Sequence, residues 1–331
     1  MASPGPRVVV FSTGGTIAMG RSAGSGGVAP SLTGADLVAA VPQLAEIGVD
    51  VEVRDFRQVP SASLTFADVV ELAGEIREAL DGGATGAVVT QGTDTIEETS
   101  YLLDLLHGGD EPVIVTGAMR NPTMAGADGP ANLLAAIQSA ASPVTRGLGC
   151  LVVFADELQL ARTVRKTHTT SIAAFTSPGS GPIGFLGEGQ PQIAAAPPRR
   201  PALPAPPPGK AAPRIALHTA TLGDDPALLE AVAGLADGVV VAALGAGHVS
   251  AAMVPVLAGL ARRIPVVLTS RTGAGPVLSA TYGFPGSESD LLGRRLISGG
   301  TLHPLKARIL LQLLVAGGAG HAAIAEAFAA G

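Results

Sequence analysis

Short apolar runs rich in Val and Ile alternate along this chain with longer segments in which apolar residues recur every three or four positions. The first pattern is typical of buried β-strands and the second of amphipathic helices. Strands are predicted at Arg7–Ser12, Val49–Phe56, Gly86–Thr90, Val113–Thr116 and Gly149–Phe154. Strands that alternate with helices favour a mostly parallel sheet with helices on both faces.

Helices are predicted between these strands from their end signals as well as from their periodicity. Thr65 and Asp68 are spaced as a capping box, and the apolar periodicity after them continues to Leu80, just before two glycines. Two further helices are predicted at Thr95–Leu106 and Asp128–Ala141. The fold class predicted for this part of the chain is therefore α/β.

A stretch rich in proline and alanine separates two parts of the chain. Residues 194–213 contain little besides Ala, Pro, Arg and Gly, which is typical of a stiff, extended connector. We therefore predict a larger N-terminal domain over residues 1–193, a linker over 194–213 and a smaller α/β domain over 214–331. In the smaller domain, strands are predicted at Arg214–Thr219, Val239–Ala243 and Val266–Ser270, and helices at Pro226–Leu235, Ser250–Ala261, Pro304–Ala316 and Ala322–Ala329.

Composition excludes several classes of protein. Hydrophobic residues make up 47 % of the 331 residues and charged residues 15 %, so the chain can bury a substantial core. The net charge of -6 leaves no basic field for nucleic acid or anionic lipid. The first apolar run is too short for a signal peptide or a membrane span, and we expect a cytoplasmic protein. The single cysteine, Cys150, lies in an apolar run and is expected to be a buried, inert thiol.

Common cofactor and nucleophile motifs are absent or misplaced. No G-x-G-x-x-G follows a strand, no phosphate-binding P-loop motif occurs, and the six histidines never fall at H-x-x-x-H spacing. We therefore expect neither a metal nor an organic cofactor. The sequence around Ser22 matches the G-x-S-x-G pattern of a nucleophile elbow, but no helix pattern follows it. A mobile, glycine-rich lid fits this segment better.

Two polar clusters follow predicted strands. Ser-Thr-Gly-Gly-Thr, ending at Thr16, follows the first strand, and Gln-Gly-Thr-Asp-Thr, over residues 91–95, follows the third. Ligands of open α/β sheets bind beyond the carboxyl ends of the strands. Two glycines before Thr16 allow a sharp turn with backbone amides that face a ligand. Each cluster alone is equally consistent with a turn or an N-cap, but a Gly-Thr pair at both strand ends favours a functional site.

The two clusters resemble the two signatures of the asparaginase/glutaminase family. The resemblance continues through four more motifs in the family's order and spans nearly the whole chain. The six matching segments are residues 10–18, 89–99, 116–120 (Thr-Gly-Ala-Met-Arg), 127–133 (Ala-Asp-Gly-Pro-Ala-Asn-Leu), 165–170 (Arg-Lys-Thr-His-Thr-Thr) and 300–308 (Gly-Thr-Leu-His-Pro-Leu-Lys-Ala-Arg).

The resemblance implies hydrolysis of L-asparagine to L-aspartate and ammonia, with Thr16 as the nucleophile that forms an acyl-enzyme. It also implies a second catalytic cluster of Thr93, Asp94 and Lys166, in which Asp94 binds the substrate's α-amino group. Lys166 accepts a proton only as a neutral amine, a form that burial favours and the charge of Asp94 opposes. Which threonine attacks, and which base serves it, stays open. Without the resemblance, the sequence favours an ordinary surface lysine at position 166 over a catalytic one.

The resemblance implies further residues that bind the substrate. Backbone amides near Thr16 and Thr93 would stabilise the oxyanion, a backbone carbonyl would receive the amide NH2, and a serine would belong to the substrate-binding loop. An acidic residue from the smaller domain would complete the site of a neighbouring subunit, which implies a homo-oligomer, a dimer or a tetramer. The residues that match these roles are Gly15, Gly92, Ala118, Ser61 and Glu288. Glu288 is nearly as consistent with a solvated loop carboxylate, and His168 is taken as an ordinary polar residue.

The chain departs from the family pattern at two places. Ala62 follows Ser61 where members often carry Gln or Glu, so selectivity between asparagine and glutamine is open. Residues 19–32 contain no tyrosine to cover the site. The alternatives are a dual glutaminase–asparaginase, an amidase subunit that serves a tRNA-bound substrate, and a non-catalytic amino-acid-binding relative. The acidic chain shows no added nucleic-acid-binding segment, which disfavours the tRNA-linked alternative.

Overall fold

The computed structural model describes residues 5–15, 17, 19–21, 28–30, 33–207, 209 and 211–330. The chain forms two compact units, residues 1–203 and residues 204–331. The division falls inside the proline- and alanine-rich stretch, whose described residues form neither helix nor strand. Within the described ranges, no helix is long and apolar enough to cross a membrane.

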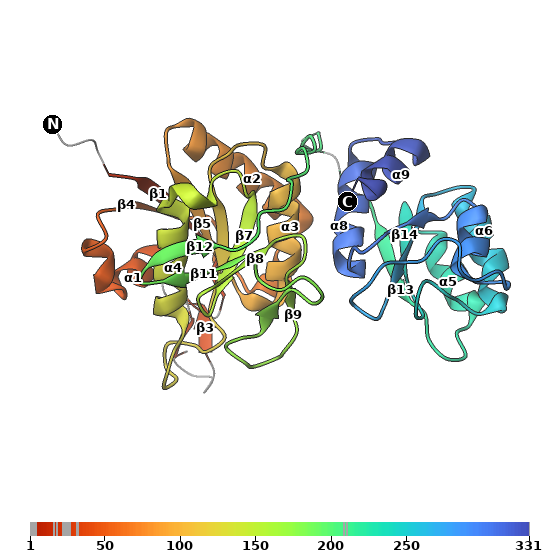
Figure 1. Cartoon of the computed structure of the whole chain (residues 1–331), viewed down its shortest axis with the longest axis horizontal. Coiled ribbons are helices and arrows are strands. Elements are labelled where there is room, and N and C mark those ends of the chain that lie inside the picture. Colours follow the sequence, from red (N-terminus) through yellow and green to blue (C-terminus); the bar gives the residue numbers. More distant parts are fainter. Residues whose placement is uncertain are drawn as a thin grey trace. The chain divides into compact units, whose positions relative to one another are not determined.

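An eight-stranded sheet forms the first unit, in the order β12-β11-β8-β7-β6-β5-β1-β4 (Figure 1). The five strands from β7 to β4 run parallel, and β8, β11 and β12 add an antiparallel edge. Two small antiparallel pairs, β2 with β3 and β9 with β10, lie outside this sheet. The strands are β1 (Arg7–Ser12), β2 (Met19–Arg21), β3 (Val28–Pro30), β4 (Asp50–Asp55), β5 (Gly86–Thr90), β6 (Val113–Thr116), β7 (Cys150–Phe154), β8 (Glu157–Leu160), β9 (Arg165–Lys166), β10 (Phe175–Thr176), β11 (Gly184–Gly187) and β12 (Gln190–Ile193).

Helices cover both faces of the sheet (Figure 1). They are α1 (Gly34–Ala39), α2 (Phe66–Asp81), α3 (Ile96–Leu106) and α4 (Gly129–Ala141). Alternate strand residues such as Val8, Val10 and Val88 share one buried cluster with Leu133 and Ile137 of α4. Because side chains alternate across a strand, the intervening residues are buried on the other face, where α2 and α3 lie. This double cover explains why the strands read as continuous apolar runs.

The second unit contains a parallel four-stranded sheet in the order β13-β14-β15-β16. Its strands are β13 (Ile215–Thr219), β14 (Gly238–Ala243), β15 (Val266–Ser270) and β16 (Ile297–Ser298). Its helices are α5 (Pro226–Ala233), α6 (Val254–Ala261), α7 (Glu288–Gly293), α8 (Pro304–Ala316) and α9 (His321–Ala329). Together the two units confirm the predicted fold class, a larger α/β part with a mostly parallel sheet and a smaller α/β part.

The longer parallel strands and most of the predicted helices agree with the structure within about two residues, although α6 begins four residues later than predicted. The helices α1 and α7, the strand β16 and the short antiparallel strands were missed. Thr65 caps α2, and its hydroxyl and the carboxylate of Asp68 bond each other's backbone N–H, so the predicted capping box is confirmed. The strands β8 to β12 are two to four residues long, and β8, β11 and β12 mix buried with exposed positions. Such short runs carry little periodic signal. Cys150 is buried in β7, as predicted.

Candidate active site

Three loops meet at the carboxyl end of the parallel strands, and glycines permit their close approach. Gly14 and Gly15, which follow β1, have φ values of +95° and +88°, a region that favours glycine. A Cβ on Gly15 would lie 2.0 Å from the backbone nitrogen of Gly92, and a Cβ on Gly92 would lie 2.7 Å from Oγ of Ser61. The loops after β1 and β5 therefore touch backbone to backbone, next to the turn that carries Ser61.

The turn Ser61–Ser63 fixes the loop after β5. The backbone N–H of Asp94 donates to Oγ of the buried Ser61 at 3.2 Å, and Oγ1 of Thr95 donates to the Ser61 carbonyl at 3.1 Å. Nε2 of Gln91 donates to Oγ1 of Thr95 at 2.9 Å. Thr93 and Asp94 thus stand on a 3-10 turn, Thr93–Thr95, that is held from both sides before α3 begins.

Lys166 reaches this turn from the β9–β10 hairpin. Its ammonium donates to Oγ1 of Thr93 at 2.8 Å and to Oδ1 of Asp94 at 2.9 Å. The hairpin places Lys166 opposite Phe175, whose ring lies 4.5 Å from that of Phe154. A buried aromatic pair therefore anchors β10, the strand that pairs with the lysine-bearing β9.

The exposure of these three side chains differs in a way that matters for a ligand. Thr93 is 6 % exposed, and the side chain of Lys166 is 17 % exposed, so the hydroxyl–ammonium contact is largely shielded from water. The side chain of Asp94 is 66 % exposed. One carboxylate oxygen of Asp94 is held by Lys166, and the exposed carboxylate can still receive the ammonium of a small ligand.

The predicted nucleophile, Thr16, lies outside the described residues, although Gly15 and Ile17 on either side of it are described. Ser22 of the G-x-S-x-G match also lies outside them. Gly20 of that match belongs to β2, and the next described element is another strand, β3. The helix that a nucleophile elbow requires does not follow among the described residues.

Ala118 lies in the loop after β6, and two residues at the start of α4 clamp that loop. The carboxylate of Asp128 accepts the backbone N–H groups of Met119 at 3.0 Å and Arg120 at 2.8 Å. Nδ2 of Asn132 donates to the carbonyl of Gly117 at 3.0 Å, and its Oδ1 accepts the N–H of Ala155 at 3.1 Å.

This clamp was not recognised from the sequence. The sequence placed Asp128 and Asn132 at the start of a helix and within a motif of the family resemblance, but gave them no role, because their partners lie 8 to 23 residues away along the chain. The clamp fixes the backbone around Ala118, whose carbonyl is a candidate substrate contact. It also ties the loop after β6 to the loop after β7.

Replacing the clamp residue Asn132 with leucine should destabilise the first unit. The change leaves the carbonyl of Gly117 and the N–H of Ala155 without their side-chain partner in a site where Asn132 is only 3 % exposed. We expect a loss of about 2–4 kcal/mol and a melting temperature lower by roughly 5–10 °C. The exposed Gln43→Leu is the matched control and should change the melting temperature by less than about 2 °C. Equal melting of wild type and Asn132→Leu would contradict the clamp.

Glu288 begins α7 in the second unit and is fully buried. Its Oε1 accepts the N–H groups of Thr281 at 3.0 Å and Tyr282 at 2.8 Å, and its Oε2 lies 3.1 Å from Nε2 of His248. Burial raises the pKa of Glu288, but hydrogen bonds from Tyr282 and the other donors outweigh it, so the pKa is lowered overall. The solvated-loop alternative is therefore wrong, because both oxygens have partners inside the unit.

His168 has a local role in the β9–β10 hairpin. Its Nδ1 accepts the backbone N–H groups of Thr170 at 3.0 Å and Ser171 at 2.9 Å, which closes the loop beside Lys166. In the part of the chain that the structure describes, no group of three or more His, Cys, Asp or Glu side chains is placed to hold a metal ion.

Comparisons with known proteins cover both units of the chain. Residues 7–199 match the family model described as asparaginase, N-terminal, and residues 214–328 match the glutaminase/asparaginase C-terminal domain. The chain is 37 % identical to a probable L-asparaginase of Deinococcus radiodurans, over 98 % of each chain. It is 34 % identical to a glutaminase-asparaginase of Pseudomonas fluorescens, over 92 % of this chain and 85 % of that one.

A solved structure extends the likeness to three dimensions. The crystal structure of a probable cytoplasmic L-asparaginase from Campylobacter jejuni superposes with a TM-score of 0.88 at 30 % identity, over 98 % of this chain and 99 % of that one. The matches cover both units of the chain and include both threonine clusters. The chain therefore belongs to the asparaginase/glutaminase family.

Proposed function

We propose that this protein hydrolyses the side-chain amide of L-asparagine to give L-aspartate and ammonia, without a metal or organic cofactor. The observation that carries the proposal is the ammonium of Lys166, which bonds both Oγ1 of Thr93 and Oδ1 of Asp94. This cluster lies at the sheet edge where the glycine turn before Thr16 meets Gly92. The names of the relatives supply the substrate, a small amino acid amide.

In the proposed first step, the hydroxyl oxygen of Thr16 attacks the amide carbon. Its proton passes to a base, the C–N bond of the tetrahedral intermediate breaks, and the amide nitrogen leaves as ammonia after it gains a proton. The product of this step is an aspartyl ester of Thr16. Backbone N–H groups of Gly15 and Gly92 are the candidate oxyanion donors, and such donors typically contribute about 3–4 kcal/mol each.

In the second step, a water molecule attacks the ester and releases L-aspartate. Because Lys166 donates to Oγ1 of Thr93, the hydroxyl proton of Thr93 is left to bond a water or the leaving group. Thr93 can therefore orient the water, and Lys166, once it is a neutral amine, can take up the proton that the water loses. Thr93 is also the alternative nucleophile, since its oxygen is already polarised by an ammonium.

The α-amino group of the substrate is assigned to Asp94, and Ser61 is assigned to the binding loop. The exposed carboxylate of Asp94 supplies charge, and the hydroxyl of Ser61 keeps its own proton for a ligand because its oxygen accepts from the N–H of Asp94. The Ala118 carbonyl is assigned to the amide NH2. Since both oxygens of Glu288 are engaged, we assign it an indirect role, in which it holds the loop that includes Tyr282.

Selectivity for asparagine is the next prediction. We expect kcat/KM for ammonia release from L-asparagine to exceed that from L-glutamine by about tenfold or more. The reason is that one extra methylene in the substrate changes the binding free energy by ~1–3 kcal/mol. Assays of both amides under matched conditions measure this ratio. Equal values would favour the dual activity that the name of the Pseudomonas fluorescens relative states. If neither asparagine nor glutamine released ammonia, the non-catalytic alternative would be favoured.

The proposal also includes the compartment and the assembly state. The Campylobacter jejuni relative is named as cytoplasmic, which supports a cytoplasmic location for this chain. We propose a homo-oligomer, a dimer or a tetramer, with no nucleic acid or membrane partner. Sedimentation of the purified protein measures its mass in solution, and a monomer at micromolar concentration would contradict the proposed assembly.

A further inference from the structure

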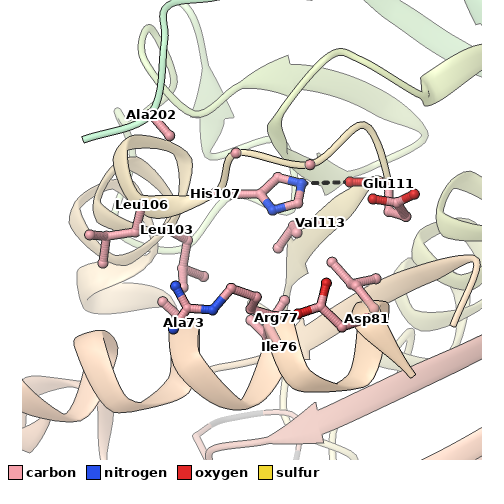
Figure 2. Close-up of a pocket in the computed structure, with 13 residues that line it drawn as sticks. Ala73, Ile76, Arg77, Asp81, Leu103, Leu106, His107, Glu111, Val113 and Ala202 are labelled. Atoms are coloured by element: carbon pink, nitrogen blue, oxygen red, sulfur yellow. Dashed lines mark hydrogen bonds between the residues drawn. The ribbon is translucent and has the colours of Figure 1, made fainter. Parts of the chain in front are cut away.

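A cavity of the first unit lies at the amino end of β6, whereas the candidate active site lies beyond the carboxyl ends of β1 and β5. It has a volume of about 270 Å³ and opens between α2 and the loop that follows α3 (Figure 2). Val113, the first residue of β6, lines the cavity, whereas the threonine clusters follow the last residues of β1 and β5. None of the candidate site residues lines it.

Apolar side chains form much of the cavity wall. Ile76 and Leu80 come from α2, and Leu103 and Leu106 come from the last turn of α3. The volume is below the range of about 300–1,000 Å³ that is typical of pockets for drug-sized ligands. The cavity therefore suits a molecule of the size of a single amino acid, with an apolar part that covers these side chains.

Two side chains of opposite charge face the cavity from α2. Arg77 and Asp81 both line it, and Figure 2 shows Asp81 on the side nearer to Glu111 and the guanidinium of Arg77 on the side nearer to Leu103. Within the described ranges, neither side chain forms an ion pair. A cationic and an anionic group are thus both available to a ligand, at separate places in one cavity.

The loop after α3 adds an acceptor to the opposite wall. Nε2 of His107 donates to the carbonyl of Glu111 at 2.7 Å, so its Nδ1 is the unprotonated nitrogen. Burial lowers the pKa of His107, which keeps the ring neutral at pH 7. In Figure 2 the ring of His107 lies across the cavity from Arg77 and Asp81. The lone pair of Nδ1 can accept a hydrogen bond from an ammonium group that Asp81 also contacts.

The loop is held in place before any ligand arrives. The guanidinium of Arg199 donates to the carbonyls of Gly109, at 2.6 Å, and of His107. The backbone N–H of His107 also donates to the carbonyl of Leu103 at 2.9 Å. Since these bonds fix the wall that carries His107, binding would order few additional groups, which favours affinity.

We propose that this cavity binds a free α-amino acid with a branched aliphatic side chain. The carboxylate of the amino acid pairs with Arg77, its ammonium lies between Asp81 and Nδ1 of His107, and its side chain packs on the leucines and Ile76. This site does not depend on the proposed hydrolytic function, because no residue is shared between the two.

Calorimetric titration of the full chain with L-leucine tests the proposal. Saturating L-aspartate is present throughout to occupy the candidate active site. We expect saturable binding below about 10 mM leucine, a range that reaches millimolar affinities. We expect at least about tenfold weaker binding of leucinol, which lacks the carboxylate, and of 4-methylpentanoate, which lacks the amine.

Matched variants on one helix complete the test. Arg77→Gln and Asp81→Asn should each weaken leucine binding by about tenfold or more, whereas Glu78→Gln, a charge change outside the cavity on the same helix, should leave it unchanged. Ammonia release from asparagine without leucine should be equal in all three variants. The proposal is overturned if leucine does not bind, if leucinol and 4-methylpentanoate bind as tightly as leucine, or if Arg77→Gln and Asp81→Asn bind leucine like the wild type.

Discussion

Thr16→Ala is expected to lower kcat for ammonia release from L-asparagine by at least about a thousandfold, because the acyl-enzyme cannot form without the hydroxyl. Binding of L-aspartate should persist within a few-fold, since the side chain removed is small and its role is in the reaction. Thr16→Ser keeps a hydroxyl and should retain part of the turnover. Steady-state assays and calorimetry on the same preparations measure both quantities.

Thr13→Ala is the control for this prediction. Thr13 lies in the same segment, but its hydroxyl donates to the backbone carbonyl of Thr90 at 3.0 Å, so its loss should affect stability more than turnover. Mass spectrometry of the enzyme quenched during turnover identifies the acylated peptide. An adduct on the peptide with Thr93, together with full activity of Thr16→Ala, would reverse the assignment of the two threonines.

Lys166→Met should lower kcat by about 100- to 10,000-fold, which is the usual contribution of a proton-transferring group. Methionine has a similar length, so the packing of the hairpin should survive, but Oγ1 of Thr93 loses its ammonium donor. The free energy of unfolding should change by less than about 1 kcal/mol, because the partner carboxylate of Asp94 is 66 % exposed and stays solvated. A large loss of activity with little loss of stability separates a chemical role from a structural one.

Lys210→Met removes the same charge from the proposed linker and serves as the control, although Lys210 lies outside the described residues. Its activity should equal that of the wild type. If Lys166→Met kept more than about half of the wild-type kcat, Lys166 would be no more than a surface lysine, the alternative that the sequence favours without the family resemblance.

Some elements of the fold could be located from the sequence, and others could not. Strands buried on both faces, such as β5 at Gly86–Thr90, and helices with strong end signals, such as α2, were located within about two residues. Each is specified by its own residues, through apolar content and capping. The hairpin that carries Lys166 was missed as an element because β9 and β10 have only two residues each. Its conformation depends on the packing of Phe175 against Phe154.

The sequence by itself determined the residue types of the candidate site and the strand ends that carry Gly15 and Thr93. The local sequence is enough for this, because glycines, apolar runs and helix caps each determine the backbone conformation of only a few neighbouring residues. Only the tertiary structure decided that Lys166, 73 residues beyond Thr93, donates to it, and that Asn132 and Asp128 hold the loop at Ala118. It also decided that Glu288 is buried against His248. These contacts join segments that are distant in sequence, and their distances follow from how the sheets and helices pack, which no local pattern encodes.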